Sequence, residues 1–178
     1  MGLTVWVVGH WRCGTNWVTT LCKPLVERVI ADSDVTDNSG IQRFRTDYPE
    51  LKFVPGGLEQ FKRYSSFACK INCLRRAQAE EILELFPESK FLRVTRNDAD
   101  TITSIATPKR SSRPARNFGM SVDEARTFVE TWTVEHYYLH SEERFKDRTH
   151  VVAYERLVAD LEAEYGRLRD WLLGEPAQ

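Results

Sequence analysis

The sequence contains no long hydrophobic run and no segment of the kind that directs secretion. No stretch approaches the roughly 18 uninterrupted apolar residues that a membrane-spanning helix requires. The first residues, Met1 to Trp6, lack a basic region followed by an apolar one. We therefore expect a cytoplasmic protein that does not bind a membrane.

An excess of charge of one sign is also missing. The 25 Lys and Arg residues nearly balance the 26 Asp and Glu residues, and the formal net charge is -1. Without a global positive field the protein is not expected to bind nucleic acid. Any anion must be bound by a local arrangement of charges.

Cysteine is scarce and is not arranged as a metal site. The four cysteines, Cys13, Cys22, Cys69 and Cys73, form neither a C-x-x-C pair nor a cluster with histidine at zinc spacing. We expect reduced, partly buried thiols and no bound metal.

What the sequence does contain is a regular alternation of two patterns. Short apolar, β-branched segments predict buried strands, and segments with helical periodicity follow them. The expected strands are 3–8, 66–71, 90–95 and 150–153, and the expected helices are 15–30 with an interruption at Pro24, 58–64, 77–86, 98–106, 121–145 and 157–173. This pattern predicts one α/β domain over residues 1–178, with three layers and a central parallel sheet of about four or five strands flanked by helices.

The first expected strand runs into a loop bounded by glycines, V-V-G-H-W-R-C-G-T-N-W. Gly9 and Gly14 enclose four residues, as in the phosphate-binding loop G-x-x-x-x-G-K-[ST]. Thr15 stands in place of the lysine, and Asn16 in place of the hydroxyl that binds magnesium. Arg12 adds a permanent positive charge inside the loop. We expect this loop to bind a phosphate-like group without a metal.

Three segments resemble those of the sulfotransferases that use 3′-phosphoadenosine-5′-phosphosulfate (PAPS). R-C-G-T-N-W, Arg12 to Trp17, is similar to the [KR]-S-G-T-T-[WL] loop of that family. K-F-L-R-V-T-R-N-D-A-D-T-I-T-S, Lys90 to Ser104, is similar to its K-x-[IL]-x-x-x-R-[ND]-P-x-D-x-x-x-S block. V-V-A-Y-E-R-L-V-A-D, Val151 to Asp160, is close to its Y-E-[DE]-L segment. The chain is identified as a short, divergent member with a fold like that of the P-loop NTPases.

The resemblance implies a reaction and a set of binding residues. The protein is expected to move the sulfuryl group of PAPS to a hydroxyl or amine of a small-molecule or carbohydrate acceptor, releasing adenosine 3′,5′-bisphosphate without a metal. The implied cofactor-binding residues are Arg12, Cys13, Gly14, Thr15, Asn16 and Trp17 at the phosphosulfate end, Arg96 and Ser104 at the 3′-phosphate, and Tyr154 at the adenine. Arg12 is also implied to be catalytic, because it would stabilise charge on the transferring group.

The general base of the family is not present in its usual place. The family motif K-[TS]-H-x-P corresponds here to K-I-N-C-L, so Lys70 matches the implied catalytic lysine while Asn72 replaces the histidine. Other branches use a carboxylate after the first helix, and Asp34 lies at about that distance. Its competitors are Glu27, Asp32 and Asp37, and His10 is a second candidate beside the loop.

Two further features leave alternatives open. The chain lacks the C-terminal R-K-G segment that grips the 3′-phosphate in cytosolic members, and the basic loop 108–116 is a candidate substitute or a solvated surface loop. A nucleotide-binding relative without activity is one alternative function, and a nucleotide kinase is a weaker one because Thr15 replaces the lysine. Residues 32–65 and 107–120 are expected to shape the acceptor pocket. The sequence does not indicate the acceptor or the oligomeric state.

Overall fold

A five-stranded parallel sheet forms the centre of the molecule. The computed structural model describes residues 2–30, 58–72, 74–107 and 120–174. The strands are β1 (Thr4–Gly9), β2 (Arg28–Ile30), β3 (Phe67–Asn72), β4 (Lys90–Thr95) and β5 (Thr149–Ala153). Their order is β2-β3-β1-β4-β5, and every pairing is parallel. The expected α/β fold with a parallel sheet is confirmed.

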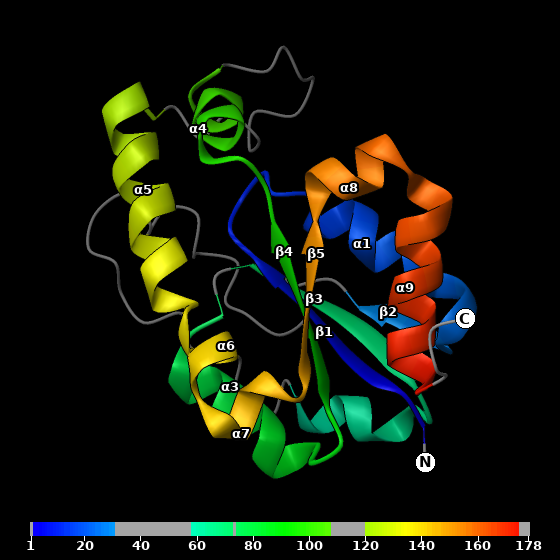
Figure 1. Cartoon of the computed structure of the whole chain (residues 1–178). Coiled ribbons are helices and arrows are strands. Elements are labelled where there is room, and N and C mark those ends of the chain that lie inside the picture. Colours follow the sequence, from blue (N-terminus) through cyan, green and yellow to red (C-terminus); the bar gives the residue numbers. More distant parts are fainter. Residues whose placement is uncertain (1, 31–57, 73, 108–119, 175–178) are drawn as a thin grey trace.

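Helices cover both faces of this sheet (Figure 1). Those of the described ranges are α1 (Thr15–Leu21), α3 (Arg76–Leu85), α4 (Asp98–Ala106), α5 (Val122–Glu135), α6 (Tyr138–Ser141), α7 (Glu143–Lys146), α8 (Tyr154–Ala159) and α9 (Leu161–Leu173), with short 3-10 helices η1 (Lys23–Leu25) and η3 (Glu59–Arg63). Helices α1, α8 and α9 lie on one side of the sheet, and α3, α5, α6 and α7 lie on the other. The molecule therefore has the three expected layers.

The central strand β1 is almost entirely apolar because both of its faces are covered. Val5 and Val7 pack into a core cluster that contains Val18 of α1. Trp6 and Val8 point to the opposite face and join a second cluster. Because successive side chains of a strand point to opposite faces, a strand covered on both sides needs apolar residues throughout.

The predicted helix over residues 15–30 is wrong beyond Leu21. Helix α1 ends there, Pro24 lies in the short helix η1, and Arg28–Ile30 form the edge strand β2 beside β3. Proline has no backbone N–H to continue an α-helix. The β-branched residues beyond it then pair with the sheet.

The predicted helix over residues 121–145 begins as expected but ends early. Ser121 and Glu124 form the predicted capping box, in which each side chain accepts a hydrogen bond from the other residue's backbone N–H. Helix α5 ends at Glu135, with His136 as its C-cap, and two short helices, α6 and α7, follow.

The predicted C-terminal helix also divides, at Asp160. The backbone of Asp160 is extended, with φ −154°, and its carboxylate accepts a hydrogen bond from the N–H of Ala163 at 3.0 Å. This side chain caps α9, which is therefore a separate helix from α8.

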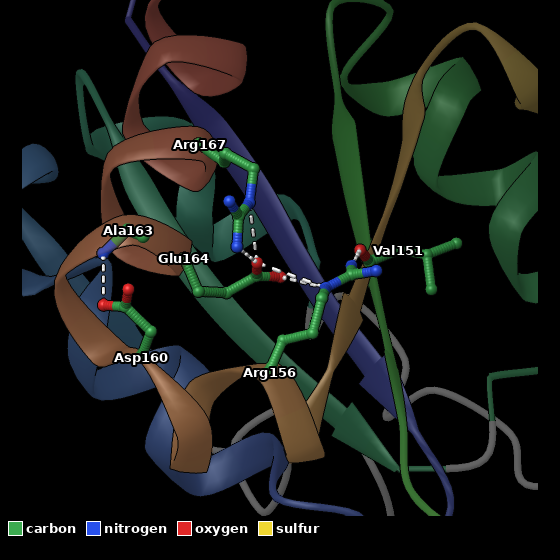
Figure 2. A network of polar contacts seen from close by, with 6 residues as sticks. All are labelled: Val151, Arg156, Asp160, Ala163, Glu164 and Arg167. Carbon is green, nitrogen blue, oxygen red and sulfur yellow. Dashed lines mark hydrogen bonds and ion pairs between the residues drawn. The ribbon is translucent and has the colours of Figure 1, made fainter.

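A buried carboxylate holds the corner between α8, α9 and β5 (Figure 2). Glu164 is 1% exposed and forms ion pairs with Arg156 at 3.1 Å and Arg167 at 2.6 Å. Arg156 also donates from Nη2 to the carbonyl of Val151 on β5 at 2.8 Å. The network fixes the chain that follows Tyr154.

We expect Glu164→Gln to lower the free energy of unfolding by about 1–3 kcal/mol, measured by urea denaturation. The loss stays moderate because Arg156 and Arg167 are half exposed, so water can solvate them once the carboxylate is gone. The control is Glu59→Gln, which breaks an exposed pair with Lys62 and should cost less than about 0.5 kcal/mol. Equal losses in the two variants would contradict a structural role for Glu164.

Candidate functional site

The candidate site lies at the carboxyl edge of the sheet, where four neighbouring strands end. Gly9 at the end of β1 is paired in register with Asn72 at the end of β3. Thr95 at the end of β4 is paired with Ala153 at the end of β5. Ligands of parallel α/β sheets bind beyond these ends.

Two residues with left-handed backbone shape the loop between β1 and α1. Gly14 has φ 106°, and Arg12 has φ 67°, the one positive value among the described residues other than glycine. A Cβ at Gly14 would lie 2.6 Å from Cδ2 of Tyr154, and one at Gly9 would lie 2.4 Å from Sγ of Cys13. Neither position accommodates a side chain, so both glycines of the motif are required by close packing.

Residues from three distant parts of the sequence meet at this loop. Arg96 follows β4 and donates from Nη1 to the carbonyl of Arg12 at 3.1 Å. Its guanidinium lies 4.6 Å from the centre of the Tyr154 ring, and Trp17 packs edge-on against that ring at 5.7 Å. We call Arg12, Trp17, Arg96 and Tyr154 the cofactor corner.

Arg96 retains hydrogen-bonding capacity in this corner. In the described part of the chain its buried Nε atom has no hydrogen-bond partner, and Nη1 makes its bond to the loop. A guanidinium has five N–H donors in a planar fork that fits an oxyanion. Arg96 is therefore suited to bind a phosphate group.

The neighbouring strand end is held in place by Glu155. Its carboxylate accepts a hydrogen bond from the backbone N–H of Asn97 at 2.7 Å. This bond joins the residue after Arg96 to the residue after Tyr154, so the two cofactor-corner side chains are kept side by side.

The thiol of Cys13 is buried inside the loop and bonded to its backbone. Cys13 is fully buried, and its Sγ donates to the carbonyl of His10 at 2.9 Å. Burial raises the pKa of this thiol to about 12, so it stays neutral. A contact of Cys13 with a cofactor would have to use its backbone N–H.

The amide of Asn72 is tied to the loop helix. Thr15 is buried, and its hydroxyl donates to Oδ1 of Asn72 at 3.2 Å. Lys70 lies two residues earlier on the same face of β3, and it is close enough to the Cys13 thiol to act on its pKa. Asn16 is exposed at the start of α1.

Ser104 lies on α4, half buried and one turn beyond the buried Thr101. Arg96 hydrogen-bonds to the loop rather than to this serine in the described structure. The shared role of Arg96 and Ser104 at a 3′-phosphate stays a prediction.

Of the four carboxylates considered as general base, Glu27 lies in the described ranges. Asp32, Asp34 and Asp37, and the basic loop 108–116, lie outside the described residues. Glu27 is described and precedes β2, so it lies at the amino edge, away from the loop. It accepts hydrogen bonds from the hydroxyl and N–H of Ser65, both at 2.9 Å, and these lower its pKa. Glu27 is not the base.

His10 is a nearly buried histidine beside the loop, with one ring nitrogen bonded to the backbone. It is 6% exposed, and its Nδ1 lies 3.0 Å from the carbonyl of Trp11. A carbonyl can only accept, so we assign the ring proton to Nδ1 and the lone pair to Nε2. Burial lowers the pKa of His10 below 6.5, so the ring is neutral at pH 7 and Nε2 can accept a proton.

Three basic side chains near this site gave no signal in the sequence. Arg93 occupies an unspecified position of the K-x-[IL]-x-x-x-R block, and His136 and His140 lie in the segment predicted as one long helix. The packing of α5 and α6 near β4 brings them together. No periodicity or spacing could have indicated it.

The described ranges contain neither a cluster of metal ligands nor a membrane-spanning helix. No group of three or more His, Cys, Asp or Glu side chains there is arranged to hold a metal ion. No helix of those ranges is long and apolar enough to cross a membrane.

Solved structures similar to this chain include sulfotransferases and kinases. Mouse sulfotransferase SULT7A1 complexed with PAP matches with a TM-score of 0.63 and 12% identity, over 98% of this chain and 60% of that one. The sulfotransferase domain of the curacin biosynthetic pathway matches at 0.55 and 14%, over 99% and 75%. A gluconokinase from Sinorhizobium meliloti 1021 matches at 0.60 and 14%, over 98% and 97%. These similarities define the class as the P-loop fold that kinases and sulfotransferases share.

Within that class the chain belongs to the sulfotransferase family, whose sequence profile matches residues 33–176. A search of curated protein sequences finds no match. The chain spans 60% of the length of the mouse sulfotransferase.

Proposed function

We propose that this protein transfers the sulfuryl group of PAPS to a hydroxyl or amine acceptor and releases adenosine 3′,5′-bisphosphate. The observation that carries the proposal is the cofactor corner, in which Arg12, Arg96 and Tyr154 meet at the carboxyl edge of a sulfotransferase-family chain. With Thr15 in place of the P-loop lysine, ATP chemistry lacks its usual positive clamp.

The residues present fit such a co-substrate. Arg96 and the Tyr154 ring would hold the nucleotide end, and Trp17 adds an aromatic face beside them. Arg12 would bind the phosphosulfate end together with the backbone N–H groups of the loop. PAPS supplies an activated sulfuryl group, so the protein need only orient the acceptor, stabilise charge and remove a proton.

We assign the proton transfer to His10. In the proposed step the acceptor oxygen or nitrogen forms a bond to sulfur while the bond from sulfur to the 5′-phosphate oxygen breaks. The proton of the acceptor passes to Nε2 of His10, and Arg12 stabilises the negative charge on the leaving phosphate. Asp34 remains an alternative base.

Calorimetric titration with adenosine 3′,5′-bisphosphate, adenosine 5′-monophosphate and Mg-ATP tests the proposal. We expect the bisphosphate to bind about 100-fold more tightly than the monophosphate, because the second phosphate adds charge-assisted hydrogen bonds. Arg96→Ala should remove most of this preference. A preference for Mg-ATP would instead indicate a kinase and overturn the proposal.

A second candidate is a nucleotide-binding relative without activity. Asn72 favours it, since an amide that accepts a hydrogen bond from Thr15 replaces the family histidine. Incubation with PAPS labelled in the sulfuryl group separates the two functions. Label transferred to an acceptor indicates an enzyme, and tight bisphosphate binding without transfer to any of a broad acceptor set indicates the binding protein.

We expect His10→Gln to lower kcat about 100-fold while bisphosphate affinity stays within about twofold. Because the pKa of His10 is lowered from 6.5, this base becomes protonated only below that pH. The wild-type activity should therefore fall on acidification below pH 6.5. Recording kcat/KM against pH for both proteins checks this. If kcat/KM of His10→Gln fell at acidic pH as much as that of the wild type, another residue would be the general base.

A further inference from the structure

A second group of basic side chains lies on the sheet face covered by α5 and α6. Arg93 comes from β4, His136 from the end of α5 and His140 from α6. Phe91 packs against Phe145 on this face, and Arg93, two residues later on the strand, points to the same side.

This group adjoins the candidate site. Arg93 is paired in register with Val8, one residue before β1 ends, so it lies near the carboxyl edge. His10 is close enough to both Arg93 and Arg96 for each to lower its pKa, and the pKa of His136 is lowered in turn by Arg93 and His10. His10 is therefore within electrostatic range of both the cofactor corner and the second group.

Arg93 has a half-buried positive charge with no acidic partner in the described ranges. Its Nη1 contacts Nε2 of His140, and no carboxylate of those ranges pairs with it. The side chain is only partly exposed, and burial lowers its pKa. Withdrawing a charge from water without a counter-charge costs free energy that a bound anion would offset.

His136 provides an independent observation. It is 2% exposed, and its Nε2 is buried without a hydrogen-bond partner in the described part of the chain. The ring also hydrogen-bonds to the backbone of Leu74, which leaves Nε2 as the atom with a lone pair. Buried polar atoms are rarely unsatisfied in native proteins, so this nitrogen is suited to accept a ligand hydroxyl.

We propose that Arg93, His136 and His140 form the acceptor subsite and that the acceptor carries an oxyanion in addition to the group that is sulfated. Arg93 binds the carboxylate, sulfate or phosphate through the N–H donors that His140 does not use. His136 accepts a hydrogen bond from a hydroxyl of the same molecule. The acceptor class is then a hydroxylated or aminated acid rather than a neutral alcohol, an inference that rests on the proposed sulfotransferase function.

The test uses the histidine ring signals in NMR spectra of the full chain saturated with adenosine 3′,5′-bisphosphate, so that the cofactor corner is filled. Sodium acetate and sodium sulfate are titrated separately, and acetamide is the neutral match for acetate, at constant ionic strength set with chloride. We expect the His136 and His140 signals to shift saturably with acetate and sulfate and not with acetamide. The absence of a saturable shift, or an equal response to acetamide, overturns the subsite.

Variants locate the binding group. Arg93→Met keeps the apolar stem, and we expect it to weaken acetate and sulfate binding at least about tenfold while bisphosphate affinity is unchanged. Arg76→Met is the matched control, because Arg76 is an exposed arginine paired with Glu142 and should leave acetate binding unchanged. Unaltered acetate binding in Arg93→Met would refute the assignment.

The two proposals fail separately. The acetate titration is repeated without adenosine 3′,5′-bisphosphate, so it still reports on Arg93 if calorimetry shows no bisphosphate preference and ends the sulfotransferase proposal. The comparison of acetate with acetamide needs no variant. It therefore tests the anion-binding subsite even if Arg93→Met does not fold.

Discussion

Arg12→Met is expected to lower kcat about 10²–10³-fold, with melting temperature nearly unchanged. Arg12 lies inside the loop with φ 67°, and Arg96 binds its carbonyl rather than its side chain. Methionine keeps the apolar stem, and its backbone must adopt the same positive φ. It removes the charge that would face the leaving phosphate. The measurement is single-turnover transfer of labelled sulfuryl groups at saturating PAPS.

Arg12→Lys is the matched control for this result. Lysine keeps a point charge but loses the planar fork, so we expect a loss of only about tenfold. Should Arg12→Met retain near wild-type kcat, the loop would bind its ligand through backbone N–H groups alone. The catalytic role proposed for Arg12 would then be withdrawn.

The second large effect is expected for Gly14→Ala, which should abolish measurable binding of adenosine 3′,5′-bisphosphate. The new Cβ would lie 2.6 Å from the Tyr154 ring, which Arg96 and Trp17 also contact. The added Cβ would displace the Tyr154 ring and so disrupt the cofactor corner. The positive φ of 106° adds about 1–3 kcal/mol of backbone strain. Calorimetry measures the binding, and urea denaturation measures the stability.

Gly174→Ala separates backbone strain from steric overlap. Gly174 ends α9 with φ 72°, and a Cβ there would have no atom within 4 Å. We expect a stability loss of about 1 kcal/mol with unchanged bisphosphate binding. If both variants bound the bisphosphate like the wild type, the packing of Tyr154 against the loop would have no part in cofactor binding.

The elements predicted correctly are those whose signals are local. The apolar, β-branched segment at β1 and the capping box of Ser121 and Glu124 each depend on residues close in sequence. The helix predicted through Ile30 failed because the same apolar spacing suits a helix and a short edge strand. Pairing of Arg28–Ile30 with β3, a contact across more than 35 residues, decided between them.

In the candidate site, too, the features predicted from the sequence are those formed by residues adjacent in the chain. The loop from Gly9 to Trp17 could be recognised because its glycines and Arg12 are adjacent in sequence. The buried position of the Cys13 thiol could not, because it depends on how the loop turns back toward the carbonyl of His10. Asp34 lies outside the described residues, and its role stays a prediction.

By itself the sequence determined the layered α/β fold, the glycine-bounded loop without a lysine and the resemblance to sulfotransferases, because each is written in short segments or in their order. Only the tertiary structure decided that Arg96 lies over Tyr154 and that Arg93 lies beside His140, with no carboxylate of the described residues paired to it. These pairs are separated by 58 and 47 residues. Sheet order and helix packing bring them together, and neither leaves a periodic trace in the chain.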